Sequence, residues 1–210
     1  MPEVKTALIV ESAPAGPGFH ALTADCAADL GASPGQWAAF HTGVPNPDKP
    51  GEVLRRAWSF ARLEGPRRFR LLVAVVGPAT RWLSERVPGE TLRFTGPWGS
   101  RFRLDDEPGP ATFFAAGSGI SPIGALLDAA LAEGRPCRLL WERPTPMLEE
   151  RLSAWERAGV QVQVGVRLEI SPDGARWWMA GDGDRLDEAL GQVSAPPERV
   201  ERFYTPRPRA

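Results

Sequence analysis

The turn-forming residues of this chain are unevenly distributed, and their distribution limits the folds that the chain can adopt. Over residues 1–104, clusters of glycine and proline such as "APAGPG", "GVPNPDKPGE" and "TGPWGS" recur at short intervals. The runs between them are short and apolar or β-branched, as in "TALIV", "LLVAVV" and "TLRFT". Short strands at this density, with no long helical repeat, predict a small antiparallel β-barrel. A single helical turn fits in "ATRWLSERV".

The pattern changes after the polar segment "DDEPGP". "ATFFAAG" is typical of a buried strand and "SPIGALLDAALAEG" of a helix, in which Ser121 is the expected cap, Pro122 suits the first turn and Gly134 ends the helix. Strands are then expected at "CRLLWER", "VQVQVGV", "RWWMAG" and "VERFYT", with helices at "MLEERLSAWERAG" and "DRLDEALG". Alternating strands and helices predict a parallel α/β sheet. We therefore expect a barrel domain at 1–106 and a nucleotide-binding-type α/β domain at 107–210.

Charge and hydropathy exclude several classes of function. The chain has 25 Lys and Arg residues against 26 Asp and Glu, a net charge of -1, which gives no overall attraction to nucleic acid or to an anionic membrane. No run of about 18 apolar residues occurs, and the start of the chain lacks a basic-then-apolar signal pattern. We expect a soluble, cytoplasmic protein with no nucleic-acid partner and no membrane span.

The residues that commonly bind metals are few. Cys26 and Cys137 are the only cysteines, and His20 and His41 the only histidines. These are too few thiolates for an iron–sulfur cluster, and their spacing matches no metal-binding motif. The sequence predicts no metal site.

A glycine-rich loop, "GSGISP" at 117–122, lies between the first α/β strand and its helix. Unpaired N–H groups at a helix start attract anions, and glycines let a phosphate come close. Ser118 and Ser121 would add hydroxyl donors. Such a loop is also often only a tight turn, and its spacing does not distinguish the two interpretations.

The stretch "RRAWSFAR" at 55–62 combines a fixed positive charge, a flat aromatic ring and a hydroxyl. By itself it is consistent with an ordinary surface strand. A guanidinium can also fork onto phosphate oxygens, and an indole can stack on a flat ligand ring.

Five motifs, taken in order, resemble the ferredoxin–NADP reductase superfamily, particularly its oxygenase-reductase branch. They are "PGQWAAF", "RRAWSFA", "GPATRWLSERVPGETLRFTGPWGSRF", "FFAAGSGISPIGALL" and "ERFYTP". The resemblance spans nearly the whole chain and implies an FAD-binding barrel followed by an NAD(P)-binding α/β domain. No cysteines for an iron–sulfur domain are present.

For the flavin, the resemblance implies that Arg56 pairs with phosphate and that Trp58 lies along the isoalloxazine ring. Trp58 replaces the family's usual tyrosine. Ser59 would form a hydrogen bond near flavin N5 and take part in catalysis. The pyrophosphate would lie against Thr80 and the backbone of the two residues Gly77 and Ala79.

For the nicotinamide nucleotide, the resemblance implies binding by two turns. The residues concerned are Gly117, Ser118, Gly119, Ile120 and Pro122 in the first turn, and Gly181 and Asp182 in the second. The family's Cys-Gly-Pro turn reads Ala180-Gly181-Asp182 here, so the thiol is missing. Glu201 matches the family's acidic residue beside the active site and is expected to be catalytic.

The end of the second α/β strand bears on the choice between NADH and NADPH. An acidic side chain there can accept bonds from the ribose of NADH, whereas an arginine can pair with the 2′-phosphate of NADPH. Glu142 and Arg143 are adjacent, so on a strand they point to opposite faces and only one can serve. We expect Arg143 to bind the phosphate, which favours NADPH.

Together these features predict an FAD-dependent NAD(P)H oxidoreductase. It would transfer electrons to a separate redox protein or small-molecule acceptor. The alternative is an accessory flavin-binding subunit whose nicotinamide chemistry is weakened or lost, which the missing thiol at Ala180 favours and the flavin motif opposes.

Overall fold

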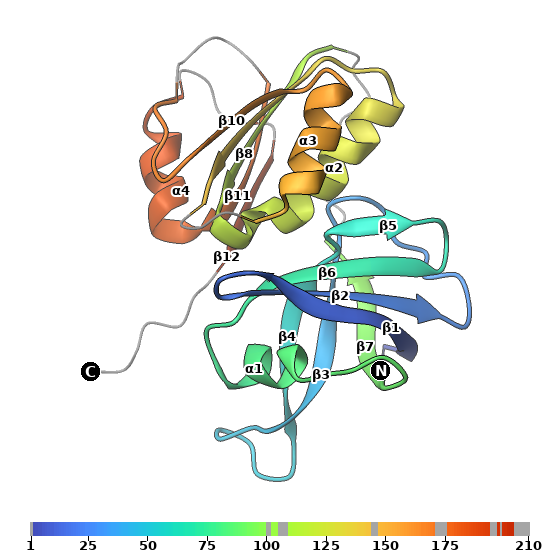
Figure 1. The fold of residues 1–210 in the computed structure, drawn as a ribbon. Helices are drawn as coiled ribbons and strands as arrows, with labels where there is room; N and C mark the ends of the chain where they lie inside the picture. The colour runs from blue at the N-terminus through green and yellow to red at the C-terminus, as the bar shows by residue number, and fades with distance from the viewer. Residues whose placement is uncertain are drawn as a thin grey trace. The chain divides into compact units, whose positions relative to one another are not determined.

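The computed structural model describes residues 2–99, 102–104, 109–143, 147–170, 176–193, 197 and 199–203. The chain divides into two compact units, Met1–Arg103 and Leu104–Ala210 (Figure 1). Each unit is described separately below.

The first unit is an antiparallel sheet of seven strands with one short helix. The sheet order is β4-β3-β7-β1-β2-β6-β5, so strands distant in sequence become neighbours. The elements are β1 (Val4–Gly16), β2 (Phe19–Cys26), β3 (Trp37–Pro45), β4 (Val53–Ser59), β5 (Arg62–Glu64), β6 (Arg68–Ala74), α1 (Pro78–Ser84) and β7 (Thr91–Trp98).

The chain itself joins the two edges of this sheet. The edge strands are β4 and β5, and only Phe60 and Ala61 lie between them. The N–H of Phe60 donates to the Gln36 carbonyl at 3.0 Å, and the N–H of Ala61 donates to the Arg70 carbonyl at 2.8 Å. These two buried residues therefore continue the hydrogen bonding of both edges and curve the sheet into a half-barrel.

Aromatic side chains fill the interior of the half-barrel. Phe40, Phe60, Phe69 and Phe94 are each 0% exposed. The ring centroids of Phe40 and Phe94 lie 5.1 Å apart, and those of Phe60 and Phe69 lie 5.2 Å apart. Fully burying a phenylalanine contributes about 1.5–3 kcal/mol, so this cluster is a main source of the unit's stability.

The second unit is a parallel sheet of five strands in the order β10-β9-β8-β11-β12. Helices α2 and α3 cover one face of the sheet and α4 covers the other (Figure 1). The elements are β8 (Ala111–Ala116), the 3-10 turn η1 (Gly117–Gly119), α2 (Ile120–Ala132), β9 (Cys137–Glu142), α3 (Glu149–Arg157), β10 (Gln161–Gly165), β11 (Trp177–Asp182), α4 (Gly183–Leu190) and β12 (Arg199–Phe203). The predicted combination of an antiparallel barrel and a parallel α/β sheet is confirmed.

Burial in the second unit follows from this arrangement. All six residues of β8 are buried, because the central strand of a parallel sheet is covered on both faces. At 13 residues, α2 is the longest helix of the described chain, and none of the described helices is long and apolar enough to span a membrane.

The start of α2 differs from the prediction, whereas its end agrees with it. Ser121 is not the cap, because α2 begins at Ile120 with Gly119 as its N-cap. The 3-10 turn η1 leads directly into the helix and shifts its start toward the N-terminus. Gly134 has φ 72°, and its N–H donates to the Leu131 carbonyl at 3.0 Å, as expected of a glycine that ends a helix.

Candidate cofactor-binding sites

Arg56 and Trp58 lie on the same face of β4, an edge strand of the half-barrel. Arg56 is in register with Phe40 and Trp58 with Ala38, and both partners are wholly buried. The Arg56 side chain is nevertheless exposed, and within the described part of the chain its Nη1 donates only to the carbonyl oxygen of Arg55, at 2.9 Å. A guanidinium on this face is therefore accessible to an anionic ligand.

The indole of Trp58 is held at the rim of the core. Its ring centroid lies 5.3 Å from that of Phe40 at an interplanar angle of 35°, and the side chain is half-buried. Packing against Phe40 fixes the ring while part of its surface stays exposed. This is the arrangement that stacking on a flat ligand requires.

Ser59 ends β4 and is 8% exposed. Because side chains alternate along a strand, it points to the face opposite Arg56 and Trp58. It is in register with Trp37, which is in register with Trp98 on β7. A ligand that contacts all three residues of the motif must therefore lie across the end of β4.

Thr80 already has hydrogen-bond partners within the first turn of α1. Its Oγ1 accepts from the N–H groups of Val76 and Gly77, each at 3.0 Å, and donates to the Gly77 carbonyl at 3.0 Å. A hydroxyl has a single proton, so this proton is used locally. A pyrophosphate role for Gly77, Ala79 and Thr80 stays a prediction, and the Thr80 hydroxyl would have to exchange a partner to fulfil it.

In the second unit, the two predicted nucleotide turns pack directly on each other. A Cβ atom on Gly119 would lie 2.0 Å from the Ala180 carbonyl oxygen. A Cβ atom on Gly181 would lie 2.7 Å from the Cβ of Ala116. These contacts join the ends of β8 and β11, which are parallel neighbours. Both glycines are therefore required by packing, whether or not they also bind a ligand.

The remaining residues of the glycine loop differ in accessibility. Gly117 has φ 54°, and its carbonyl accepts from Trp141 Nε1 at 3.0 Å, which fixes the loop. Gly117 and Ser118 are half-buried, whereas the side chains of Ile120 and Pro122 are buried. Direct contact with a nucleotide is thus most feasible at Gly117 and Ser118.

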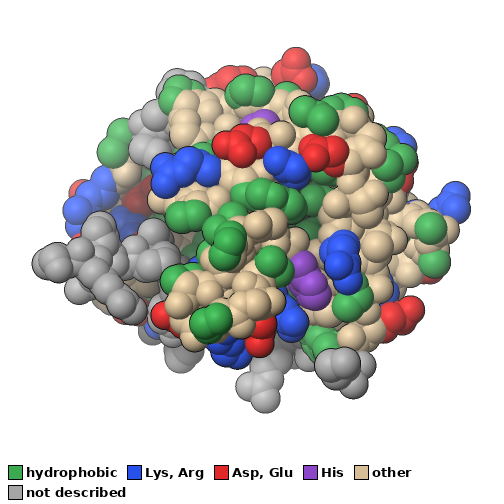
Figure 2. All heavy atoms as spheres, turned by 90° about the horizontal axis from the view of Figure 1, so that it is seen from below, with side chains coloured by type: hydrophobic (Ala, Val, Ile, Leu, Met, Phe, Trp, Pro, Cys, Tyr) green, Lys and Arg blue, Asp and Glu red, His purple; other side chains and the backbone are tan. Residues whose placement is uncertain are grey.

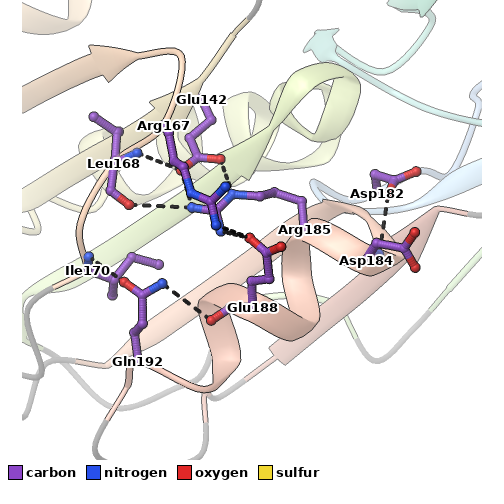
Figure 3. A network of polar contacts seen from close by, with 9 residues as sticks. All are labelled: Glu142, Arg167, Leu168, Ile170, Asp182, Asp184, Arg185, Glu188 and Gln192. Carbon is purple, nitrogen blue, oxygen red and sulfur yellow. Dashed lines mark hydrogen bonds and ion pairs between the residues drawn. The ribbon is translucent and has the colours of Figure 1, made fainter.

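Glu201 lies beside the turn at Ala180 and Gly181. It is in register with Ala180, which is wholly buried. Burial raises the pKa of Glu201 above the usual range of a glutamate. The carboxyl group therefore retains its proton at a higher pH than an exposed glutamate does, as a proton-donating group requires. Asp182 caps α4, and its Oδ1 accepts from the N–H of Asp184 at 3.2 Å (Figure 3).

Glu142 belongs to a network of charged groups at the end of β9 (Figure 3). Its carboxylate is 5% exposed and accepts from Nε and Nη2 of Arg185 and, at 2.7 Å, from the N–H of Leu168. Arg185 Nη1 also bonds Glu188, which pairs with Arg167, each at 2.6 Å. Glu142 already accepts three hydrogen bonds and is almost fully buried, so a ribose hydroxyl has little access to this carboxylate.

Arg143 also has protein partners. Its Nη1 donates to the Met147 carbonyl and forms an ion pair with Glu149 at 2.8 Å. The guanidinium carbon lies 5.3 Å from the centre of the Trp141 ring. Its predicted contact with a 2′-phosphate stays a prediction, and a phosphate would compete with Glu149 for the same nitrogen.

Sequence reasoning missed Arg185 and the network around it. One signal was present: Glu142 ends the apolar run "CRLLW", and a buried carboxylate needs a partner. The partner lies 43 residues away on α4 and shares no local motif with it.

Comparison with known proteins finds curated relatives and solved structures that are similar to the chain. No family model matches the chain. The chain is 37% identical to ferredoxin–NADP reductase B of Sorangium cellulosum over 108 residues, which are 50% of this chain and 42% of that protein. It is 32% identical to the dihydroorotate dehydrogenase B electron transfer subunit of Listeria monocytogenes over 100 residues, 47% of this chain and 37% of that protein. Among solved structures, the ferredoxin reductase in carbazole 1,9a-dioxygenase matches with a TM-score of 0.79 at 19% identity, over 96% of this chain and 70% of that one.

The chain has a ferredoxin–NADP reductase-like fold. The resemblance inferred from the sequence motifs is therefore confirmed. The chain spans less than half the length of the curated relatives that it matches.

Proposed function

We propose that this chain is an FAD-dependent NAD(P)H oxidoreductase that transfers electrons to a separate redox protein or small-molecule acceptor. The main support is the pair Arg56 and Trp58 on the exposed edge strand β4. The two residues share a face, at a spacing of about 6.7 Å along the strand. An accessible guanidinium and a fixed indole at this distance fit the phosphate and the ring of a flavin.

FAD would bind to the first unit and the nicotinamide nucleotide to the second. When bound, FAD supplies the hydride and electron chemistry. Arg56 binds phosphate, Trp58 orients the ring, and Ser59 donates a hydrogen bond at the end of β4. In the second unit, the backbone of Gly117 and the Ser118 hydroxyl contact the nucleotide. Glu201 holds a proton beside the turn at Ala180.

The relatives support electron transfer in general but not one partner. The Sorangium protein is named a ferredoxin–NADP reductase, and the Listeria protein an electron transfer subunit. The first name agrees with a reductase, and the second agrees with a subunit that passes electrons within a complex.

The alternative, an accessory flavin subunit with weakened nicotinamide chemistry, is favoured by the turn in the second unit. Ala180 provides no thiol and is wholly buried, and its carbonyl leaves no room for a side chain at Gly119. A turn packed this closely leaves little space for a nicotinamide ring at that point.

The visible spectrum of the purified protein distinguishes the two functions. The reductase should be yellow, or become so after addition of FAD, and should lose its flavin absorbance under anaerobic conditions when NADH or NADPH is added. An accessory subunit would retain FAD but stay oxidised with both nucleotides. A protein that fails to bind added FAD would contradict both.

A further inference from the structure

Three basic residues form a row across the outer face of the half-barrel. His41 on β3 is in register with Arg55 on β4 and with Arg93 on β7. Both arginines are exposed and His41 is half-buried. Neighbouring strands lie about 4.8 Å apart, so the row spans about 10 Å. Because side chains alternate, Arg55 faces away from Arg56 and Trp58, the two main residues of the proposed flavin site.

The surroundings of this row are basic. Elements β4, β7 and α1 pack against β3. The described residues of these four elements include no Asp or Glu, and the charged residues on the packed elements are Arg55, Arg56, Arg81 and Arg93. On the face drawn in Figure 2, acidic and basic side chains are interspersed, and a histidine lies next to a basic side chain.

Without a ligand, the row formed by Arg55, His41 and Arg93 reduces the stability of the folded protein. A protonated His41 would lie directly opposite a like charge on each neighbouring strand, and such pairs destabilise a sheet. Burial, followed by the charges of Arg55 and Arg93, lowers the pKa of His41. The Nε2 atom of His41 is buried and has no hydrogen-bond partner among the described residues. A buried ring nitrogen without a partner costs further stability.

We propose that Arg55, His41 and Arg93 form a binding site for a phosphate-class oxyanion, separate from the flavin site. Two guanidinium groups on either side of an imidazole can share one tetrahedral anion. The anion supplies a counter-charge for the two guanidinium groups and for the protonated imidazole. Binding of the anion favours the protonated ring and therefore raises the pKa of His41.

Proton NMR can test this site, because the chain has only two histidines. The flavin-saturated protein is titrated with inorganic phosphate, and sodium chloride at equal ionic strength serves as the salt control. The expected result is a rise of about one unit in the pKa of His41. His20, whose Nε2 bonds Ser12 Oγ at 2.8 Å, should not respond. An equal response of both histidines, or of His41 to chloride, would overturn the proposal.

Variants that each remove one arginine charge test whether phosphate binds at this row. Arg55→Gln and Arg93→Gln should each weaken phosphate binding about tenfold, the effect of losing one charge-assisted bond. The matched control is Arg67→Gln, which removes an exposed arginine elsewhere on the same unit. Equal weakening in Arg67→Gln would mean general charge screening and would reject the site.

Two further titrations test which kind of phosphate binds here and whether the site is distinct from the flavin site. Glycerol 3-phosphate replaces inorganic phosphate in one, and tighter binding of the ester would assign the site to a phosphate monoester. In the other, the His41 response is measured in Arg56→Gln. The response should persist there, and its loss would place the anion in the flavin site. None of these measurements requires flavin reduction, so the inference can fail independently of the proposed function.

Discussion

The guanidinium of Arg185 is directed at both carboxylate oxygens of Glu142, across 43 residues of sequence. The carboxylate is almost fully buried at the end of β9, and the guanidinium comes from the first turn of α4. The pair therefore links α4 to the sheet beside the turn at Ala180 and Gly181.

Replacing Arg185 with methionine should destabilise the protein substantially. The change leaves the buried Glu142 carboxylate with the Leu168 N–H as its one remaining partner among the residues that the structure describes. Removing one member of a buried ion pair costs about 3–5 kcal/mol. The control is Arg202→Met, which breaks the exposed pair with Asp187 and should cost about 0–1 kcal/mol. Urea denaturation measures the free energy of unfolding of both variants. Equal losses would contradict the stabilising role assigned to Arg185.

An added methyl group on Gly119 should disrupt the junction of β8 and β11. In Gly119→Ala the new Cβ would overlap the Ala180 carbonyl oxygen, and overpacking of this kind costs about 1–3 kcal/mol or more. Gly183→Ala is the control, since a Cβ atom there meets nothing within 4 Å. Thermal unfolding of the two variants should differ clearly, and similar melting temperatures would show that the loop can move aside.

Loss of Arg56 should weaken flavin binding without unfolding the barrel. The side chain is exposed, and a charge-assisted bond to phosphate contributes about 1.5–3 kcal/mol. Ser59→Ala should have a smaller effect on affinity and slow flavin reduction. Flavin fluorescence titration gives the dissociation constants, with Arg67→Ala as the control. Unchanged binding in Arg56→Ala would reject the role of this stretch.

Arg143→Ala should reduce the kcat/KM with NADPH about tenfold or more and spare that with NADH, if the guanidinium contacts the 2′-phosphate. Glu149→Gln removes its ion-pair partner and should leave NADPH use intact or improved. Steady-state kinetics with both nucleotides decide the point. Equal losses with NADH and NADPH in Arg143→Ala would assign the residue to the structure of the strand end.

Stability should fall as the pH decreases below about 6.5, the ordinary pKa of a histidine. The main cause is burial, which lowers the pKa of both His20 and His41 in the folded protein. Between the folded and unfolded pKa values the unfolded chain binds more protons, so acid favours unfolding. The double variant His20→Gln/His41→Gln should flatten the dependence of unfolding free energy on pH between 5 and 7. An unchanged slope would show that other groups dominate.

The division of the fold into two parts could be predicted because its signals are local. Glycine and proline clusters mark turns, and helical spacing marks α2, so each part is recognisable from short windows. Pairings between distant strands carry no such signal. The neighbours of β7 in the sheet are β1 and β3, which no short motif indicates.

In the candidate sites, too, local features could be predicted from the sequence and tertiary features could not. Arg56 and Trp58 were predictable as one face of a strand, because they are two residues apart. The hydrogen bonds of the Thr80 hydroxyl depend on the backbone geometry of α1 and could not be predicted from residue types. The partner of Glu142 depends on how α4 packs on the sheet, which is a tertiary property.

The junction at Phe60 and Ala61 has a consequence for engineering. The sheet of the first unit is continued from β4 to β5 by a covalent link rather than by a ladder between those strands. A circular permutant opened at this link would keep every strand pair of the sheet but lose the connection that holds its two edges together. The same cut falls directly after the Arg-Arg-Ala-Trp-Ser stretch. Retention of flavin by that permutant would show whether β4 can present its side chains without the curvature that the closed chain imposes.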